Sequence, residues 1–408
     1  MSSVVNNSNA NSAIVQTIEA SESLRNPNVY STKEIFPPHS MTYSKCESSN
    51  GSVTSGGSLN FNLNKYGIAS QILLHIEKTQ LNAAGAPEGT PTLVLNQGDI
   101  FNIIKSVELL SSSRVISTIT SADLMAMFSN LDQAEFNVVQ STAITVGSSA
   151  ASRHTFVVPL VFGLFKDINL QPNLSFVEPM SIRVNWGNVN ASASDAATGF
   201  SVALDQSNTY LQVRYKAYPE DKVAQILDEN YSQPELNQLS TRFYNENQVA
   251  ITGDGSAKDY DIDLKNTDAV KDFYIVVRPA YTNAQAVTGN ARYSPVKINN
   301  VKFTGSGQEI LNLSEHETPY LKLNPYGNAE VVNLVTGVFA MGHIVKIQTG
   351  VYHRDAMTNC FSLREINAPR ITLTLAVNGA YTIDVVEDCL AIYSTSSATG
   401  RMNLSLSN

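Results

Sequence analysis

Apolar and polar residues alternate along most of the chain with the period of two that is typical of half-buried β-strands. In the first half, this alternation or a short apolar run occupies residues 59–63, 72–76, 103–110, 115–119, 156–162, 180–186 and 210–218. In the second half, it occupies residues 243–252, 259–264, 273–278, 296–303, 309–313, 344–352, 371–377 and 382–393. The pattern therefore predicts about eight strands in each half.

Helical signals are few and short. Ser121-Ala122-Asp123 is typical of a helix cap and predicts a short helix over residues 124–131. Pro219-Glu220-Asp221 predicts a second helix over residues 222–230, which would connect the two halves. A helical turn is also expected near Tyr320.

Two stretches 194 residues apart share one order of strand, turn, strand and helix start, which suggests a tandem duplication. In the first stretch the corresponding positions are Ile104, Val107, Leu109, Ser111–Ser113, Ile116, Ile119, Asp123, Met127 and Asn130. In the second they are Ile298, Val301, Phe303, Gly305–Gly307, Ile310, Leu313, Glu317, Leu321 and Asn324. Few of these pairs are identical, so the shared order of elements carries the inference.

Glycine-rich segments between strands predict hairpins. Gly253-Asp254-Gly255 separates residues 243–252 from residues 259–264 and predicts a turn that joins them as a hairpin. Gly305-Ser306-Gly307 lacks the third glycine of a dinucleotide-binding loop and lies between two strands. We therefore interpret it as a hairpin turn without a phosphate site.

Composition supports an all-β protein with two domains. The 408 residues are enough for two domains, and only 15% are charged, where about 25% is usual. Eight antiparallel strands in each half, with short inserted helices, indicate two tandem eight-stranded antiparallel jelly rolls, that is, a double jelly roll. The expected organisation is an N-terminal arm over residues 1–45, a first jelly roll over 46–220, a helical linker over 221–236 and a second jelly roll over 237–408.

The charge balance excludes some classes of partner. A net charge of −9 is unsuited to neutralising phosphates, so we expect no direct sequence-specific nucleic acid binding. Residues 1–26 lack the basic start and apolar core of a signal peptide. The arm either docks on another surface or is a frayed terminus. The longest apolar run, residues 156–165, is too short for a membrane span and is interrupted by Pro159 and Gly163.

The three cysteines, Cys46, Cys360 and Cys389, form no CxxC pair. Such a set is typical of a protein that does not use disulfides as its scaffold, and we assume a reducing compartment during folding. Cys360 and Cys389 could meet across neighbouring strands, whereas two buried thiols are the simpler interpretation.

We considered several groups of residues as chemical sites and predict no catalytic, cofactor-binding or metal-binding residues. His353-Arg354-Asp355 resembles part of a kinase catalytic loop, but the other kinase motifs are missing. Asp259, Asp261 and Asp263 match the first ligands of a calcium loop, yet the required glycine and final glutamate are absent. Their alternation with apolar residues favours a strand with outward acids.

Two further candidates have equally simple structural interpretations. Glu315-His316-Glu317 places acids beside a histidine without the spacing of a metal centre. Trp186, the only tryptophan, could stack on a sugar, but its position at a strand end favours packing at the rim of the barrel. We therefore expect no enzymatic activity and no cofactor.

Three segments of the second half resemble a known family. They are residues 269–277 (AVKDFYIVV), residues 359–373 (NCFSLREINAPRITL) and residues 385–392 (VVEDCLAI). In content and order they are similar to motifs in the second jelly roll of double jelly-roll major capsid proteins. This family occurs in DNA viruses of the adenovirus-like, nucleocytoplasmic large DNA virus and virophage lineage, which commonly enclose an internal membrane.

The resemblance implies a structural role. It implies homotrimers that act as pseudo-hexagonal capsomers and tile an icosahedral virion shell assembled inside the host cell. The implied partners are neighbouring capsomers, penton and minor capsid proteins, and an internal membrane reached by the arm at residues 1–45. One alternative is a receptor-binding or glycan-binding β-sandwich protein of a virion or cell surface. Another is a carbohydrate-active enzyme, which would need a close pair of carboxylates.

Overall fold

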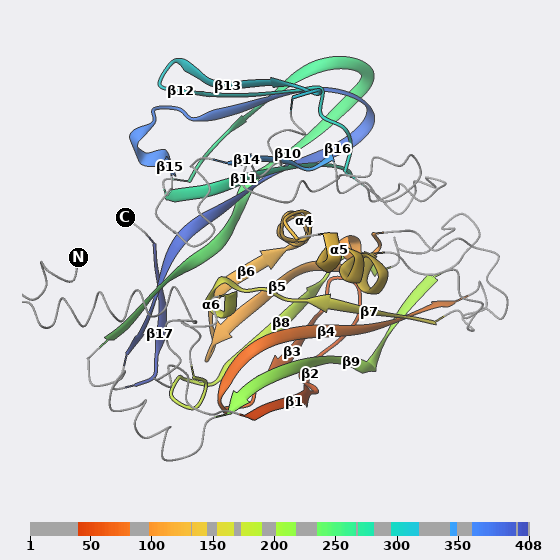
Figure 1. The fold of residues 1–408 in the computed structure, drawn as a ribbon. Coiled ribbons are helices and arrows are strands. Elements are labelled where there is room, and N and C mark those ends of the chain that lie inside the picture. The colour runs from red at the N-terminus through yellow and green to blue at the C-terminus, as the bar shows by residue number, and fades with distance from the viewer. Residues whose placement is uncertain are drawn as a thin grey trace, which may run out of the picture.

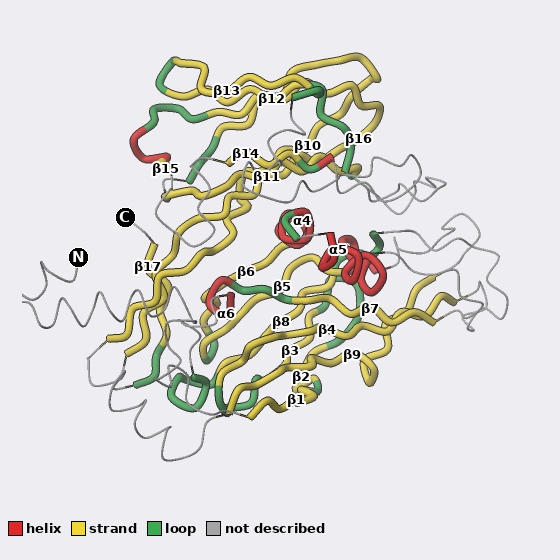
Figure 2. The backbone as a smooth tube through the Cα atoms, viewed as in Figure 1, coloured by secondary structure: helices red, strands yellow, loops and turns green. Residues whose placement is uncertain are grey.

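The computed structural model describes residues 40–81, 98–131, 133–144, 153–166, 173–189, 201–217, 235–266, 268–280, 295–317, 343–348, 361–396 and 399–406. Within these residues strands predominate and pair in antiparallel sheets. Figure 1 shows two β domains stacked on one another. Figure 2 shows that the helices α4, α5 and α6 gather on the side of the first domain that faces the second.

The first jelly roll consists of two sheets. One is four-stranded, in the order β1 (Ser40–Cys46), β9 (Ser201–Ala217), β4 (Ile68–Leu81) and β7 (Arg153–Pro159). The other is five-stranded, in the order β2 (Ser48–Gly51), β3 (Ser58–Asn62), β8 (Met180–Trp186), β5 (Ile104–Ser111) and β6 (Arg114–Thr120). The period-two pattern turns Leu74 and Ile76 of β4 and Ile182 of β8 into the core, where each is fully buried.

Short helices fill the connections of this domain. They are α3 (Ile100–Ile103), α4 (Ser121–Ser129), α5 (Gln133–Val139), the π-helix η3 (Gln140–Ile144) and α6 (Gly163–Lys166). The predicted helix at residues 124–131 exists, but it begins at Ser121. Its cap is Thr120, because the Thr120 hydroxyl accepts from the Asp123 N–H while the Asp123 carboxylate accepts from the Thr120 N–H.

The second jelly roll is one continuous eight-stranded sheet that folds over itself. Its path is β13 (Gln308–Ser314), β12 (Asn300–Gly305), β16 (Arg370–Ser396), β11 (Ala269–Pro279) and β14 (Val345–Gln348). Off this path, β10 (Glu235–Asp263) and β17 (Met402–Leu406) pair with β16, and β15 (Phe361–Ser362) pairs with β11. The 3₁₀-helix η8 (Leu363–Glu365) follows β15.

The hairpin predicted at Gly253-Asp254-Gly255 is wrong. The chain continues through these residues as part of the 29-residue strand β10, which pairs with β16 along its length. Gly253 pairs with Gly379, and the pairing register shifts between Asp254 and Ala257, so Gly255 and Ser256 form a β-bulge rather than a turn. Gly255 (φ +90°) and Gly379 (φ +104°) adopt backbone angles that favour glycine on both sides of this bend.

Bending of the β10–β16 ribbon creates the sandwich. Residues 370–374 of β16 pair with β12, whereas residues 381–389 of the same strand pair with β11. The two parts of the ribbon therefore belong to facing layers, which Figure 1 shows as the curl where β10 and β16 turn together. Phe273 of β11 and Phe303 of β12 meet inside, with their ring centroids 5.7 Å apart.

The structure supports the proposed duplication at two local motifs. The β5–β6 and β12–β13 hairpins turn at Ser112 and Ser306, which lie 194 positions apart and have φ of 54° and 52°. After each hairpin, a carboxylate accepts from a backbone N–H three residues earlier. Asp123 accepts from Thr120 in the first copy, and Glu317 accepts from Ser314 in the second. The helical turn predicted near Tyr320 lies outside the described residues.

Two strands extend beyond the domain limits expected from the sequence. Strand β1 begins at Ser40, so residues 40–45 of the expected arm pair with β9 as an edge of the first jelly roll. Strand β10 begins at Glu235, within the expected helical linker at 221–236. Residues 1–39 and 218–234, which contain the rest of the arm and of the linker, lie outside the described residues.

Candidate functional site

Helix α4 connects the two jelly rolls through an apolar contact. It follows β6 of the first domain and lies beneath β11 and β16 of the second (Figure 1). Tyr274 and Val276 of β11 and Val386 of β16 belong to the same buried cluster as the core of the first jelly roll. The remaining side of the β11–β16 layer faces a separate core within the second domain. This layer therefore contributes to two cores at once.

A buried ion pair lies at the same contact. Arg278 of β11 donates from Nε to Asp384 Oδ2 at 2.8 Å and from Nη1 to the Ser121 hydroxyl of α4 at 2.7 Å. Asp384 is fully buried and also accepts from Gln248 Nε2 at 2.7 Å. A charged hydrogen bond that is shielded from water is stronger than one at the surface. Arg278 thus connects strands of the second domain to the helix of the first.

Asp123 of α4 lies beside this ion pair and is buried. Burial raises the pKa of its carboxyl to about 7, and the nearby Asp384 carboxylate acts in the same direction. The hydrogen bonds from Thr120 and the charge of Arg278 act in the opposite direction, but they are smaller. A carboxyl that titrates near neutrality therefore lies within the contact between the domains.

The pKa of Asp123 predicts a pH dependence of stability. From the ordinary value of 3.8 up to about 7, the folded protein retains a proton that the unfolded chain releases, so the wild type loses stability as pH rises. Asp123→Asn removes this loss and keeps an oxygen that accepts from Thr120. We expect the variant to gain on the order of 1–4 kcal/mol over the wild type above about pH 7, and little near pH 4.

Urea unfolding of both proteins at these two pH values measures the effect. Asp205→Asn is the matched control, because hydrogen bonds from Ser207 lower the pKa of exposed Asp205. Its contribution to stability is present at neutral pH and disappears as pH falls, which is the opposite sign. A difference between Asp123→Asn and the wild type that is equal at both pH values would contradict the prediction.

A second contact between the domains involves the far end of the β10–β16 ribbon. Ser240 of β10 donates from its hydroxyl to the Gly163 carbonyl of α6 at 2.5 Å. A Cβ at position 163 would lie 1.6 Å from the Thr241 carbonyl oxygen, so only glycine permits this approach. Arg114 of β6 donates to the Met402 carbonyl at 2.8 Å and to Asn403 Oδ1 at 2.7 Å. The two domains are therefore joined at separated points.

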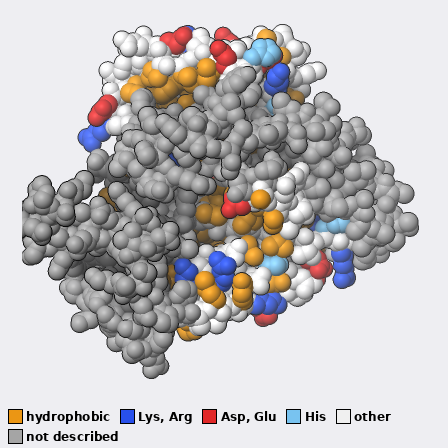
Figure 3. Space-filling model, viewed as in Figure 1, with side chains coloured by type: hydrophobic (Ala, Val, Ile, Leu, Met, Phe, Trp, Pro, Cys, Tyr) orange, Lys and Arg blue, Asp and Glu red, His pale blue; other side chains and the backbone are white. Residues whose placement is uncertain are grey.

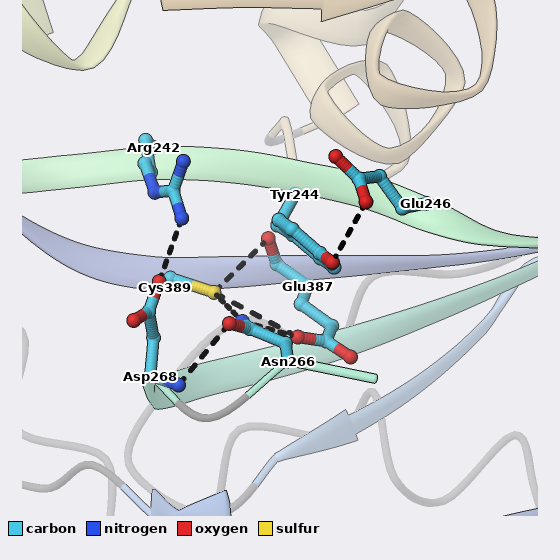
Figure 4. Close-up of polar contacts among 7 residues, drawn as sticks. All are labelled: Arg242, Tyr244, Glu246, Asn266, Asp268, Glu387 and Cys389. Carbon is cyan, nitrogen blue, oxygen red and sulfur yellow. Dashed lines mark hydrogen bonds and ion pairs between the residues drawn. The ribbon is translucent and has the colours of Figure 1, made fainter. Parts of the chain in front are cut away.

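Buried polar side chains fasten the start of β11 to the ribbon (Figure 4). Asn266 donates to Glu387 Oε2 at 2.6 Å, and Asn247 donates to Glu387 Oε1 at 2.7 Å. Arg242 pairs with Asp268 at 2.7 Å. Burial raises the pKa of Glu387 to about 7 and raises the pKa of the neighbouring Cys389 thiol. This network serves the packing of strands, because its members are turned away from solvent.

The residues considered as chemical sites do not converge. Asp261 and Asp263 point outward and pair with Arg370, while Asp259 accepts from Thr374, as expected for a strand with outward acids. Lys297 pairs with Glu315 at 3.0 Å. Among the described residues, no group of His, Cys, Asp or Glu has the arrangement of a metal site.

The remaining candidates have simple outcomes or lie outside the described residues. Trp186 is 1% exposed, as the packing interpretation expects, and Ser306-Gly307 forms the predicted hairpin turn. Cys46 and Cys389 are buried thiols. His353-Arg354-Asp355 and Cys360 lie outside the described residues. Sequence reasoning missed Arg278 and Asp384, which the pairing of β11 with β16 brings together.

In the described part of the chain, no helix combines the length and the apolar character that a membrane span requires. The fold consists of two β-sandwich domains that share local motifs and are joined through α4 and the β10–β16 ribbon. It is a double jelly roll.

Comparison with known proteins identifies this fold through structure rather than sequence. No protein-family model and no curated protein matches the chain. The PBCV-1 VP54 structure fitted into a cryo-EM reconstruction of the virophage Sputnik aligns with a TM-score of 0.67 at 12% identity, over 93% of this chain and 99% of that chain.

Two major capsid proteins align similarly. The major capsid protein of mavirus aligns with a TM-score of 0.58 at 12% identity, over 92% of each chain. The major capsid protein of Faustovirus aligns with a TM-score of 0.58 at 10% identity, over 89% of this chain and 91% of that chain. The protein therefore shares the double jelly-roll fold of these viral capsid proteins, as the sequence motifs led us to expect.

Proposed function

We propose that the protein is the major capsid protein of a DNA virus and that its homotrimers tile an icosahedral virion shell. The observation that carries this proposal is the structural likeness to viral capsid proteins, which extends over both jelly rolls and nearly all of each chain. A likeness limited to one jelly roll would fit many binding proteins, because single β-sandwiches serve many functions.

The joining of the two domains supports a tile. Three copies of a chain with two similar domains present six similar units around one axis, which suits a position with six neighbours. Such a unit must keep its two domains in a fixed relation. The apolar contact under α4, the buried Arg278–Asp384 pair and the close approach at Gly163 act in that direction.

Edge strands with exposed apolar side chains supply surfaces for contacts between copies. Met41 and Tyr43 are exposed on β1, and Ile310 is exposed on β13, which are edge strands of their sheets. Figure 3 shows hydrophobic side chains over β12 and β13 at the top of the view, and others among Lys and Arg over β1, β9 and β4 at the bottom. Uncovered edges of this kind favour association.

The proposal includes further partners and a location. Neighbouring capsomers, penton proteins and minor capsid proteins would surround the trimer in the virion, after assembly inside the host cell. Residues 1–39 precede the edge strand β1 in the sequence, and we assign to them the contact with an internal membrane or with a neighbour. The role is structural, and we expect no catalytic activity.

The mass of the purified protein in solution tests the proposal. Light scattering should give about three times the chain mass of 44.3 kDa, and negative-stain images of the same peak should show a hexagonal outline. A protein that remains monomeric at high concentration would contradict the capsid tile. Glycan binding by such a monomer would favour the alternative of a receptor-binding or glycan-binding β-sandwich protein.

A further inference from the structure

A lysine and an aspartate are in direct contact inside the first jelly roll. Lys78 of β4 directs Nζ to within 2.5 Å of Asp99 Oδ2, and the two side chains are 1% and 0% exposed. Buried ion pairs are usually poor contributors to stability, because both charges lose their hydration. The Lys78–Asp99 pair is more buried than Lys346–Asp272, whose side chains are 13% and 2% exposed, and far more buried than the surface pair Lys258–Asp254.

Asp99 contacts the lysine instead of capping the helix that it precedes. Asp99 occupies the N-cap position of α3, where an aspartate normally accepts from the first backbone N–H groups of the helix. Its side chain makes no such capping bond. The backbone of Gly98 is held by a hydrogen bond to the Ile144 carbonyl at 3.0 Å, which fixes the segment that presents Asp99.

The surroundings of the pair are apolar. Leu204 of β9 lies opposite Lys78 in the sheet, and Ile76 precedes it on the same face of β4. Ile100 follows Asp99, and Ile144 lies at the adjoining backbone contact. All four side chains are at most 7% exposed. Such surroundings exclude water, which would otherwise compete with the amine for the carboxyl group or hydrolyse the product of their reaction.

Strand β7, which pairs with β4 on the side opposite β9, places a histidine next to Lys78. His154 of β7 is the direct cross-strand partner of Lys78 and is 8% exposed. Directly opposed residues in neighbouring strands point to the same face of a sheet, so His154 and Lys78 share the inner face. An imidazole can both accept and donate a proton. The site therefore combines an amine, a carboxyl group and a group that can transfer protons.

We propose that Lys78 and Asp99 form a covalent isopeptide bond after folding. The uncharged amine, formed when the proton of the ion pair passes to the carboxylate, attacks Asp99 Cγ with its nitrogen lone pair. His154 takes a proton from the nitrogen and delivers it to the departing hydroxyl. A C–N bond forms, a C–O bond breaks, and one water molecule leaves. The reaction needs no oxidant, reductant or other co-reactant.

Proximity makes this condensation favourable. Groups held in reactive geometry within one molecule behave as if present at effective concentrations of roughly 10⁵–10⁸ M. The product amide also replaces two buried charges with one neutral group, which removes the cost of burying them. The bond is therefore favoured in the folded protein but not in the unfolded chain.

The bond would close a loop of the chain between Lys78 of β4 and Asp99 at the start of α3, which lie 21 positions apart. A cross-link of this kind restricts the unfolded chain in the same way as a disulfide does. Unlike a disulfide, an amide persists in a reducing compartment. The described cysteines are free thiols, so such a bond would provide the first jelly roll with a covalent cross-link. This inference does not depend on the proposed function.

Digestion with a protease that cleaves on the C-terminal side of glutamate, applied to full-length protein that has first folded and is then denatured, tests the bond directly. Cleavage after Glu77, Glu88 and Glu108 separates residues 78–88 from residues 89–108. In a cross-linked protein these two fragments remain joined, and the mass of the pair is one water molecule below the sum of the two. Separate fragments with their full masses in the wild type would overturn the proposal.

Variants and an internal control make the result specific. Lys78→Met and Asp99→Ala remove one reacting group each and should release both fragments. The exposed Lys258–Asp254 pair, whose atoms are 2.8 Å apart, lies in the fragment 247–309 and should keep its full mass. His154→Phe should lower the cross-linked fraction at a fixed time after folding. An unchanged fraction would overturn the role of His154 and leave the bond itself in place.

Discussion

Arg278→Met is expected to lower the free energy of unfolding by about 3–5 kcal/mol, because it leaves the buried Asp384 carboxylate without its cationic partner. Methionine retains most of the aliphatic length of arginine, so the change removes charge and hydrogen bonds more than volume. The lost bonds include the one to Ser121, which joins β11 to α4 across the domain contact. Denaturant unfolding at neutral pH measures the effect.

Two comparisons separate the ion pair from other causes. Arg153→Met removes an exposed arginine whose closest approach to Glu77 is 3.9 Å, too long for a strong ion pair, and should cost less than about 1 kcal/mol. Adding Asp384→Leu to Arg278→Met should recover part of the loss, because the unpaired charge is then gone. A loss for Arg278→Met no larger than that for Arg153→Met would contradict the assigned role.

Trp186→Ala is expected to cost about 3–5 kcal/mol, in the range of large aromatic residues removed from cores. The side chain is 1% exposed and belongs to the main apolar cluster of the first jelly roll. Its strand is fixed there by pairing with Ile104 of β5 and by a backbone bond to the Gly57 carbonyl at 2.9 Å. The cavity left by alanine cannot close without moving these strands.

Thermal or denaturant unfolding of Trp186→Ala and of a matched surface variant tests this prediction. Tyr43→Ala removes an aromatic ring that is 63% exposed on β1 and should change stability by no more than about 0.5 kcal/mol in the isolated chain. An effect of Trp186→Ala as small as that of Tyr43→Ala would mean that the ring is not a packing residue. That result would favour the alternative that Trp186 stacks on a sugar.

The elements that could be predicted from the sequence depend on local signals. Strand β8 coincides with the predicted residues 180–186, because alternation of apolar and polar side chains directly reports one buried face. The hairpin turn predicted at Gly305-Ser306-Gly307 likewise involves residues within a few positions of each other. These local motifs also made the duplication visible at low identity.

The errors arose where distant residues decide the structure. Gly253-Asp254-Gly255 has the composition of a turn, but pairing with Asn378 and Gly379 holds β10 extended through it. The same limitation hid the contact between the domains. Arg278 and Asp384 are 106 positions apart and meet only because β11 and β16 are neighbours. No short motif marks either residue as one half of a buried pair.

The contact around α4 also has a consequence for synthesis on the ribosome, where N-terminal domains generally fold first. Residues 40–217 can complete their two sheets before β11 and β16 have been translated. Until then, the surface of α4 that will contact β11 and β16 remains uncovered. Arg114 must likewise await Met402, which lies 288 positions later. The nascent first jelly roll therefore passes through a period in which its future domain contact can aggregate, and chaperones would have most to protect at that stage.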